Sequence, residues 1–150
     1  MEIHRGFLEK AWCDGIISSY LSNFEYSPRG KWNAYTLSKE NPLYGEIFRK
    51  FSPLVPYDFN VNWINITVYE KGRGLGHHKD EASSLTIVSN LNEDYQGGAF
   101  ILNKREKYEL KVGDVLLFNG STTYHGVEPI ESGIRYSLNL WTTPANTSII

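Results

Sequence analysis

The apolar residues of this chain change their periodicity at Pro56, and that change constrains the fold more than any other feature. Before Pro56, gaps of three to five between apolar residues predict amphipathic helices over residues 7–24 and 43–52. The Asp14-Gly15 pair could split the first of these helices. After Pro56, apolar and polar residues alternate, which is typical of strands that bury one face. The chain is therefore expected to place two helices before a β-rich core.

Turn signals divide the part of the chain after Pro56 into many short segments. Strands are expected near residues 59–70, 75–81, 84–91, 98–103, 106–111, 114–119, 123–128 and 133–142. Many short strands after two helices favour a mainly β, α+β fold, with a closed or sandwiched antiparallel core and the helices against one sheet. The length predicts one domain, 1–150, with a helical lead-in over about 1–56 and a β core over about 57–143.

Two of the expected strands separate an apolar face from a polar one. Successive side chains of a strand point to opposite faces, so alternate residues share a face. The apolar sets, which predict packing away from the cavity, are Ile64, Ile66 and Val68 on one strand and Tyr136, Leu138 and Leu140 on the other. The polar sets, which predict a cavity, are Asn65, Thr67 and Tyr69, and Arg135, Ser137, Asn139 and Trp141.

The segment His78-Lys79-Asp80 carries the strongest chemical signal in the chain. In an extended tripeptide the first and third side chains point to the same side, so the imidazole and the carboxylate converge. His125 offers a second imidazole on a late strand, and two imidazoles with one carboxylate describe the facial triad of non-haem Fe(II) sites. Taken singly, each residue has a commoner role, as a surface histidine, a turn aspartate and a core histidine.

Arg135 follows His125 by ten residues, on the polar face of its expected strand. A guanidinium inside a protein core is costly unless an anion pairs with it, and a planar carboxylate fits its fork. The partner is either the carboxylate of a ligand or an internal one such as Glu109 or Glu128.

Taken in order, these motifs resemble the prolyl-hydroxylase branch of the 2-oxoglutarate/Fe(II) oxygenases. The matching segments are Tyr69-x8-His78-x-Asp80, Thr86–Asn92, Tyr95–Phe100, Gly113–Phe118 and His125-x9-Arg135-x5-Trp141. They cover about residues 59–142, which is most of the chain. The resemblance implies a double-stranded β-helix, a jelly-roll or cupin-like barrel buttressed by the two helices.

The same resemblance implies a metal centre and a cosubstrate pocket. His78, Asp80 and His125 would hold Fe(II), and Arg135 would pair with the distal carboxylate of 2-oxoglutarate. The further residues implied are Tyr69, Thr86 and Asn90 beside the cosubstrate and Trp141 on the substrate side. Relatives often carry a tyrosine where this chain has Asn90, whose shorter amide can still donate a hydrogen bond.

The implied reaction hydroxylates a prolyl residue in a peptide or protein, consuming O2 and releasing succinate and CO2, with ascorbate as a reductant. The glycine-rich loop 72–76 suits a lid, and its Arg73 is expected to contact the substrate. Trp32 and Tyr35, in the polar segment 26–41, are further candidates for a peptide groove. They could equally pack on the first helix.

Three other functions stay open: a hydroxylase of free proline or another amino acid, an AlkB-type nucleic-acid demethylase, and a barrel-fold binding module without metal. The net charge of −2 and the pI of about 6.1 give no electrostatic reason to expect nucleic acid. AlkB-type relatives also carry a second arginine where this chain has Trp141. The single cysteine, Cys13, excludes an intramolecular disulfide. Without a signal peptide or a long apolar run, the chain is expected to be cytoplasmic, with no membrane partner.

Overall fold

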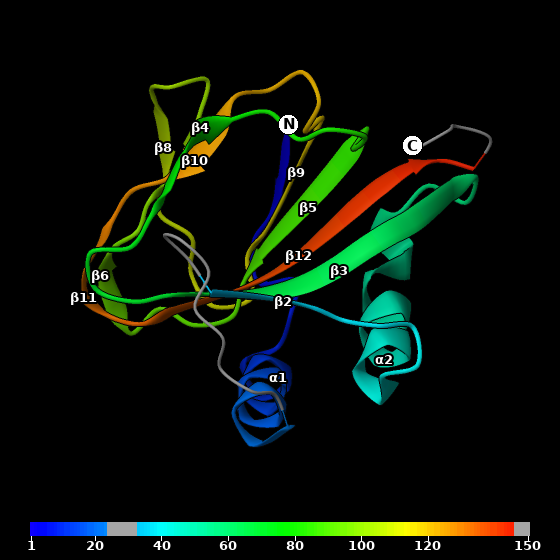
Figure 1. Cartoon of the computed structure of the whole chain (residues 1–150), viewed down its shortest axis with the longest axis horizontal. Helices are drawn as coiled ribbons and strands as arrows, with labels where there is room; N and C mark the ends of the chain where they lie inside the picture. The colour runs from blue at the N-terminus through cyan, green and yellow to red at the C-terminus, as the bar shows by residue number, and fades with distance from the viewer. Residues whose placement is uncertain (24–32, 146–150) are drawn as a thin grey trace.

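The computed structural model describes residues 1–23 and 33–145, in which two antiparallel sheets face each other above a pair of helices (Figure 1). The helices are α1 (Lys10–Asn23) and α2 (Pro42–Phe51), and a short 3-10 turn, Ser52–Leu54, follows α2. The strands are β1 (Glu2–His4), β2 (Asn33–Thr36), β3 (Phe59–Tyr69), β4 (Leu75–His78), β5 (Leu85–Asn90), β6 (Tyr95–Gly97), β7 (Phe100–Leu102), β8 (Glu106–Tyr108), β9 (Val115–Phe118), β10 (His125–Val127), β11 (Ile130–Gly133) and β12 (Arg135–Pro144).

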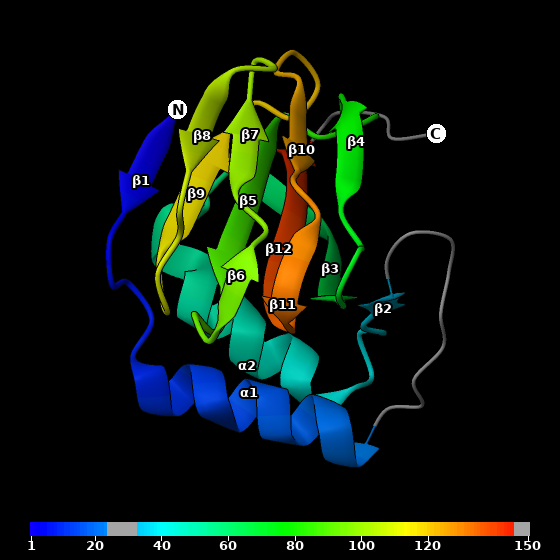
Figure 2. The same cartoon turned by 90° about the vertical axis from the view of Figure 1, so that its left-hand side faces the viewer.

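The larger sheet has six strands in the order β1-β9-β5-β12-β3-β2, and the smaller one has four in the order β4-β10-β7-β8. A two-stranded piece, β11-β6, joins them at one end. Figure 2 shows the four-stranded sheet from its outer side, with β4 at its edge. Each sheet is open, and the two together form the mainly β core that the sequence predicts, which confirms the expected fold class.

The helices form where their local sequences favour them and where one face can be buried. The side chain of Asn41 accepts a hydrogen bond from the Leu43 amide at 3.0 Å and so caps α2, whose first residue is Pro42. The expected split of the first helix does not occur, because α1 runs unbroken through Gly15. One glycine costs a helix about 1 kcal/mol, and α1 offsets this by burying Cys13 and Ile16.

The core beneath the larger sheet contains the apolar set of β3 and β12. Ile64, Ile66 and Leu138 are fully buried there, together with Ile16 of α1 and Ile47 of α2. The prediction that these sets pack away from the cavity is therefore confirmed. Within the described ranges, no helix has the length and apolar character needed to cross a bilayer.

Four short strands were not predicted from the sequence. These are β1, β6, β11 and β2, the last of which lies inside the segment 26–41 that was expected to be turn-rich. Each has only three or four residues, too few for a periodicity to be read, and each is defined by its partner strand across the sheet.

Candidate metal and cosubstrate site

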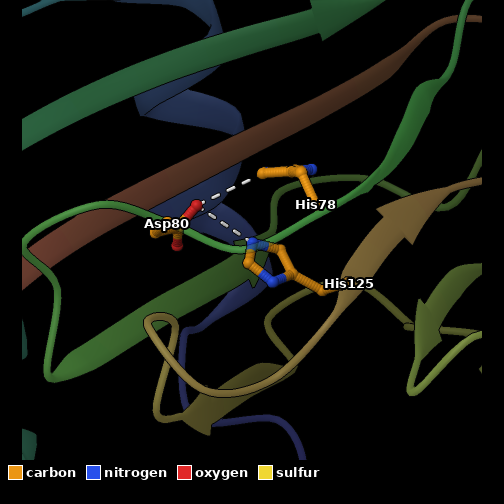
Figure 3. Close-up of side chains that lie close together, drawn as sticks. All are labelled: His78, Asp80 and His125. Carbon is orange, nitrogen blue, oxygen red and sulfur yellow. Dashed lines mark hydrogen bonds and ion pairs between the residues drawn. The ribbon is translucent and has the colours of Figure 1, made fainter.

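The side chains of His78 and Asp80 meet that of His125, from a distant segment of the chain, between the two sheets (Figure 3). β10 pairs with β4 so that His125 lies directly opposite His78, and the ring centroids are 4.3 Å apart. Asp80 Oδ1 lies 3.3 Å from Nε2 of His78 and 3.1 Å from Nε2 of His125. The three potential ligand atoms lie within 4.8 Å of one another, so the arrangement could hold one metal ion.

The second nitrogen of each histidine contacts a backbone carbonyl. Nδ1 of His78 lies 2.8 Å from the Gly76 oxygen, and Nδ1 of His125 lies 2.8 Å from the Thr123 oxygen. A carbonyl only accepts, so Nδ1 carries a proton in both rings, and each Nε2 offers its lone pair to a metal once it has lost its own proton. Such contacts fix the tautomer and the orientation of metal-binding histidines.

Asp80 lies two residues beyond the end of β4, although the sequence predicted a strand through residue 81. Its position is set by contacts outside the strand: the backbone amide donates to the Gly120 oxygen at 2.8 Å. Thr86 Oγ1 and Trp141 Nε1 donate to Oδ2 at 2.9 and 3.1 Å. With Oδ2 engaged, Oδ1 is the carboxylate oxygen that faces both histidines.

Electrostatics couple Asp80 to the two histidines. Burial would raise the pKa of the Asp80 carboxyl, but the hydrogen bonds with His125 and His78 outweigh it and hold that pKa well below its usual range. The hydrogen bond with Asp80 raises the pKa of the His78 imidazole, although burial opposes this shift. Asp80 is therefore ionised at neutral pH and available as a ligand.

His125 is held by aromatic rings that the sequence reasoning did not single out. The residue is 4 % exposed, with the Phe118 ring centroid 4.8 Å away and Phe100 stacked at 6.1 Å. Gly120 was also missed: a Cβ there would collide with Thr86 Oγ1 and would lie 2.6 Å from Asp80 Oδ2. The position next to the carboxylate therefore has no room for a side chain.

Arg135 is only 1 % exposed, and in the part of the chain that the structure describes its guanidinium is hydrogen-bonded at Nε but not at its two Nη atoms. Nε donates to Asn90 Oδ1 at 2.9 Å, whereas the buried Nη1 and Nη2 have no hydrogen-bond partner among the described residues. The guanidinium carbon lies 5.2 Å from the centroid of the Tyr69 ring. The suggested internal partner Glu128 instead pairs with Lys107 at 3.0 Å. A buried, unpaired fork is the geometry that receives a planar carboxylate.

A cavity of about 440 Å³ connects this fork to the three potential metal ligands. It is lined by the polar sets of β3 and β12 that the sequence predicted, with Thr86 and Val88 of β5 and Phe100 and Val127 opposite. Burial raises the pKa of the Tyr69 hydroxyl, although the charge of Arg135 opposes it, so this hydroxyl stays a donor in the cavity at neutral pH.

Several other predicted site residues lie away from this cavity. Asn90 is fully buried behind Arg135, and its amide nitrogen donates to the Tyr95 hydroxyl and to the Asn92 and Leu110 carbonyls. Arg73 lines a separate hollow beside β4, and Tyr35 packs against the core beneath the larger sheet. Trp32 lies outside the described residues.

Comparison with known proteins establishes the family. A sequence model of the 2OG-Fe(II) oxygenase superfamily matches residues 64–143, which include all three potential ligands and Arg135. The chain therefore belongs to the 2OG-Fe(II) oxygenase superfamily. A PKHD-type hydroxylase from Synechococcus is 33 % identical over 96 residues, covering 54 % of this chain and 42 % of that protein. The chain thus spans less than half the length of this curated relative.

Solved structures share the fold at low sequence identity. The viral collagen prolyl hydroxylase of Paramecium bursaria Chlorella virus-1, in complex with 2-oxoglutarate, superposes with a TM-score of 0.78 at 19 % identity, covering 94 % of both chains. A Pseudomonas putida prolyl-4-hydroxylase gives 0.79 at 15 % identity, covering 95 % of this chain and 91 % of that one. HygX from Streptomyces hygroscopicus, with nickel and 2-oxoglutarate, gives 0.78 at 12 %, covering 98 % and 84 %. The fold is thus the expected double-stranded β-helix.

The residues present fit the metal and cosubstrate of this family. Two imidazole nitrogens and one carboxylate oxygen on one side of a cavity leave positions for other ligands, as non-haem Fe(II) sites do. The two unpaired Nη atoms of Arg135 provide the donors that the distal carboxylate of 2-oxoglutarate would need.

Proposed function

We propose that the chain is a 2-oxoglutarate- and Fe(II)-dependent dioxygenase that hydroxylates a prolyl residue in a peptide or protein. The observation that carries the proposal is that the potential ligands His78, Asp80 and His125 line the same cavity as the guanidinium of Arg135. The two Nη atoms of that guanidinium have no partner among the described residues. O2 would be the second cosubstrate, and succinate and CO2 would be the coproducts.

When bound, iron and 2-oxoglutarate would supply the oxidising chemistry, in which one atom of O2 enters a substrate C–H bond and the other enters succinate. The protein contributes binding and orientation. Nε2 of His78, Nε2 of His125 and Asp80 Oδ1 would hold the metal, while Thr86 and Trp141 keep Asp80 Oδ2 turned away from it.

The rest of the cavity would orient the cosubstrate. Arg135 would receive its distal carboxylate, and the Tyr69 hydroxyl would donate to it from the neighbouring strand. Asn90 would act through Arg135, because its amide oxygen fixes Nε and thereby the direction of the Nη fork. Buried in this way, the ion pair would be screened little by salt.

Support for a prolyl substrate comes from the structural neighbours. They include the collagen prolyl hydroxylase above and a prolyl hydroxylase from Trichoplax adhaerens in complex with a hypoxia inducible factor peptide, with a TM-score of 0.72 at 17 % identity, covering 95 % of this chain and 83 % of that one. Trp141 lines the cavity, where its ring would contact a substrate. Arg73 lies beside β4, so a peptide substrate would have to extend past the cavity to contact it.

A direct test loads the protein anaerobically with Fe(II) and 2-oxoglutarate, then admits air in the presence of a panel of proline-containing peptides. A gain of one oxygen in a peptide, with an equal amount of succinate, is the expected result. His78→Ala, Asp80→Ala and His125→Ala should each abolish turnover and leave the fold intact by circular dichroism. Full activity in any one variant would remove that residue from the metal site. An unchanged substrate KM in Arg73→Ala would likewise remove Arg73 from the substrate site.

A second candidate is hydroxylation of a small molecule such as free proline. It is favoured by the small volume of the cavity, about 440 Å³, and by a HygX structure that contains hygromycin B, with a TM-score of 0.77 at 13 % identity, covering 98 % of this chain and 84 % of that one. Free L-proline in the same assay separates the two: oxygen incorporation there, with none in any peptide, would replace the peptide proposal.

A further inference from the structure

Two lysines share one tyrosine ring beside the metal ligands. The ammonium groups of Lys79 and Lys104 lie 4.6 and 4.5 Å from the centroid of the Tyr124 ring, so they are no more than about 9 Å apart. All three side chains are exposed, and Tyr124 keeps 40 % of its surface in solvent. We refer to these three residues as the lysine–tyrosine cluster.

The cluster is tied to the site by the chain itself. Lys79 stands between the potential ligands His78 and Asp80, and Tyr124 immediately precedes His125. None of the three lines the cavity, so the cluster lies outside it. Consecutive Cα atoms are about 3.8 Å apart, which places the backbone of Lys79 and Tyr124 close to that of all three ligands.

Lys104 reaches the ring from an unfavourable backbone position. Arg105 donates to the Leu102 carbonyl at 3.2 Å across Asn103 and Lys104, whose φ angles are +54° and +65°, which is a type I′ turn. Glycine is preferred at the second of these positions, because a side chain there is strained. The Asn103 amide donates to the Tyr124 carbonyl at 2.8 Å and holds this turn against the ring.

The cluster also lacks an anion. In the described part of the chain no carboxylate pairs with Lys79 or Lys104, whereas Lys107 on the same hairpin pairs with Glu128. Two like charges near one ring repel each other, and the face of the ring offsets only part of this. The cluster therefore offers two positive charges without a counter-ion, next to the exposed apolar ring of Tyr124.

We propose that the lysine–tyrosine cluster binds an acidic side chain of the peptide substrate, next to the residue that enters the cavity. This inference rests on the proposed function, since it takes the substrate to be a peptide. An extended peptide advances about 3.3 Å per residue, so a peptide with one residue in the cavity leaves its flanking residues outside it, where the cluster lies. The cluster then selects acidic sequences around the target residue.

The test is a binding measurement that needs no turnover. A short fluorescein-labelled peptide with a central proline and flanking aspartates is titrated with the manganese-loaded protein, and fluorescence polarisation is recorded at low and high salt. The comparison peptide has asparagine in place of each aspartate. The acidic peptide is expected to bind about three- to tenfold more tightly than the comparison peptide, and salt should remove the difference. Equal affinity of the two peptides at low salt would overturn the proposal.

Lys104 provides the decisive variants, because it is not adjacent to a metal ligand. Lys104→Gly relieves the strained turn, so its melting temperature should equal or exceed that of the wild type while the preference for the acidic peptide falls. Lys104→Glu should abolish the preference. Lys39→Glu, an exposed lysine outside the cluster, makes the same change in net charge and should leave the preference intact. An equal loss in Lys39→Glu would overturn the proposal in favour of a general charge effect.

A single-stranded oligonucleotide serves as the competing ligand. If it bound in a Lys104-dependent manner and the acidic peptide did not, the cluster would be a phosphate site for nucleic acid and the proposal would be wrong. The result also stands apart from the enzymatic assay: failure of every peptide to gain oxygen would refute the proposed function, whereas the charge preference alone decides the role of the cluster.

Discussion

Trp141 donates its indole N–H to Asp80 Oδ2 at 3.1 Å, on the carboxylate oxygen that neither histidine contacts. Thr86 donates to the same oxygen at 2.9 Å, and the Ser83 hydroxyl lies 2.7 Å from that of Thr86. A carboxylate held in this way offers one oxygen to a metal rather than two. Trp141 and Thr86 therefore act as positioning residues for Asp80.

Replacing Trp141 by phenylalanine removes this donor and keeps an aromatic ring in the cavity wall. We expect Mn(II) affinity to fall about tenfold, the lower end of the effect seen when a hydrogen bond to a metal ligand is lost. Anaerobic calorimetry measures it. Trp63 lies opposite Trp141 on β3 and makes no hydrogen bond to Asp80, so Trp63→Phe is the matched control and should bind Mn(II) normally. Wild-type affinity in Trp141→Phe would show that the indole does not position the carboxylate.

Arg135→Lys keeps the positive charge but removes the two-pronged fork. Affinity for 2-oxoglutarate should fall about 10–150-fold, the equivalent of about 1.5–3 kcal/mol for a charged hydrogen-bond pair. Mn(II) affinity should stay unchanged, because no contact joins Arg135 to the potential ligands among the hydrogen bonds of the described residues. Arg49→Lys, at an exposed position of α2, is the control. Unchanged cosubstrate binding in Arg135→Lys would exclude this arginine from the cosubstrate site.

Asn90 is expected to affect 2-oxoglutarate only through Arg135. Asn90→Ala leaves Nε of the buried guanidinium without its acceptor, so cosubstrate affinity should fall by a smaller factor than in Arg135→Lys. In the Arg135→Lys background the second substitution should add little, because the interaction it removes is already lost. Additive losses measured by calorimetry would instead indicate a separate contact between Asn90 and the cosubstrate.

The sequence predicted those features that depend on strand periodicity. Alternation on residues 59–70 and 133–142 separated the cavity face from the core face, and it put both Tyr69 and Arg135 on the inner side, where both line the cavity. A local pattern of this kind reports which way a side chain points. It also places potential ligands on inward faces, and the family resemblance supplied which of them meet.

Contacts between distant segments could not be read in the same way. The hydrogen bond from Trp141 to Asp80 joins residues 61 positions apart, and that from Arg135 to Asn90 joins residues 45 apart. The second depends on the register in which β12 lies beside β5, and the first also on how the segment between β4 and β5 lies against β12. No turn or alternation in the sequence specifies either one. The sequence therefore indicates roles for Trp141 beside the substrate and Asn90 beside the cosubstrate but not their hydrogen bonds with Asp80 and Arg135.

Gly120 offers a test of how tightly the metal site is packed. A methyl group in Gly120→Ala would meet Thr86 Oγ1 and Asp80 Oδ2, so the carboxylate must move and Mn(II) binding should weaken by at least about tenfold. Gly15→Ala in α1 is the matched control, because its added methyl group meets nothing within 4 Å. That control should bind Mn(II) normally and gain up to about 1 kcal/mol in free energy of unfolding. Normal Mn(II) binding by Gly120→Ala would show that the site can relax.

Metal binding should weaken as the pH falls, beginning above pH 6.5. The hydrogen bond with Asp80 raises the pKa of His78 above its ordinary 6.5, so a proton must leave this imidazole before Nε2 can bind a metal. Below that raised pKa, each pH unit should weaken Mn(II) binding by up to about tenfold for the proton displaced.

The metal-free protein should show the opposite trend. A raised pKa in the folded state adds stability that is fully present below the unfolded value and is lost as the pH rises through the folded pKa. Its melting temperature should therefore decline over the pH range in which Mn(II) affinity grows, as followed by calorimetry and thermal denaturation on the same samples. His4→Gln, far from the site on β1, should keep both trends. A pH-independent Mn(II) affinity between pH 6 and 8 would contradict the role of His78 as a ligand.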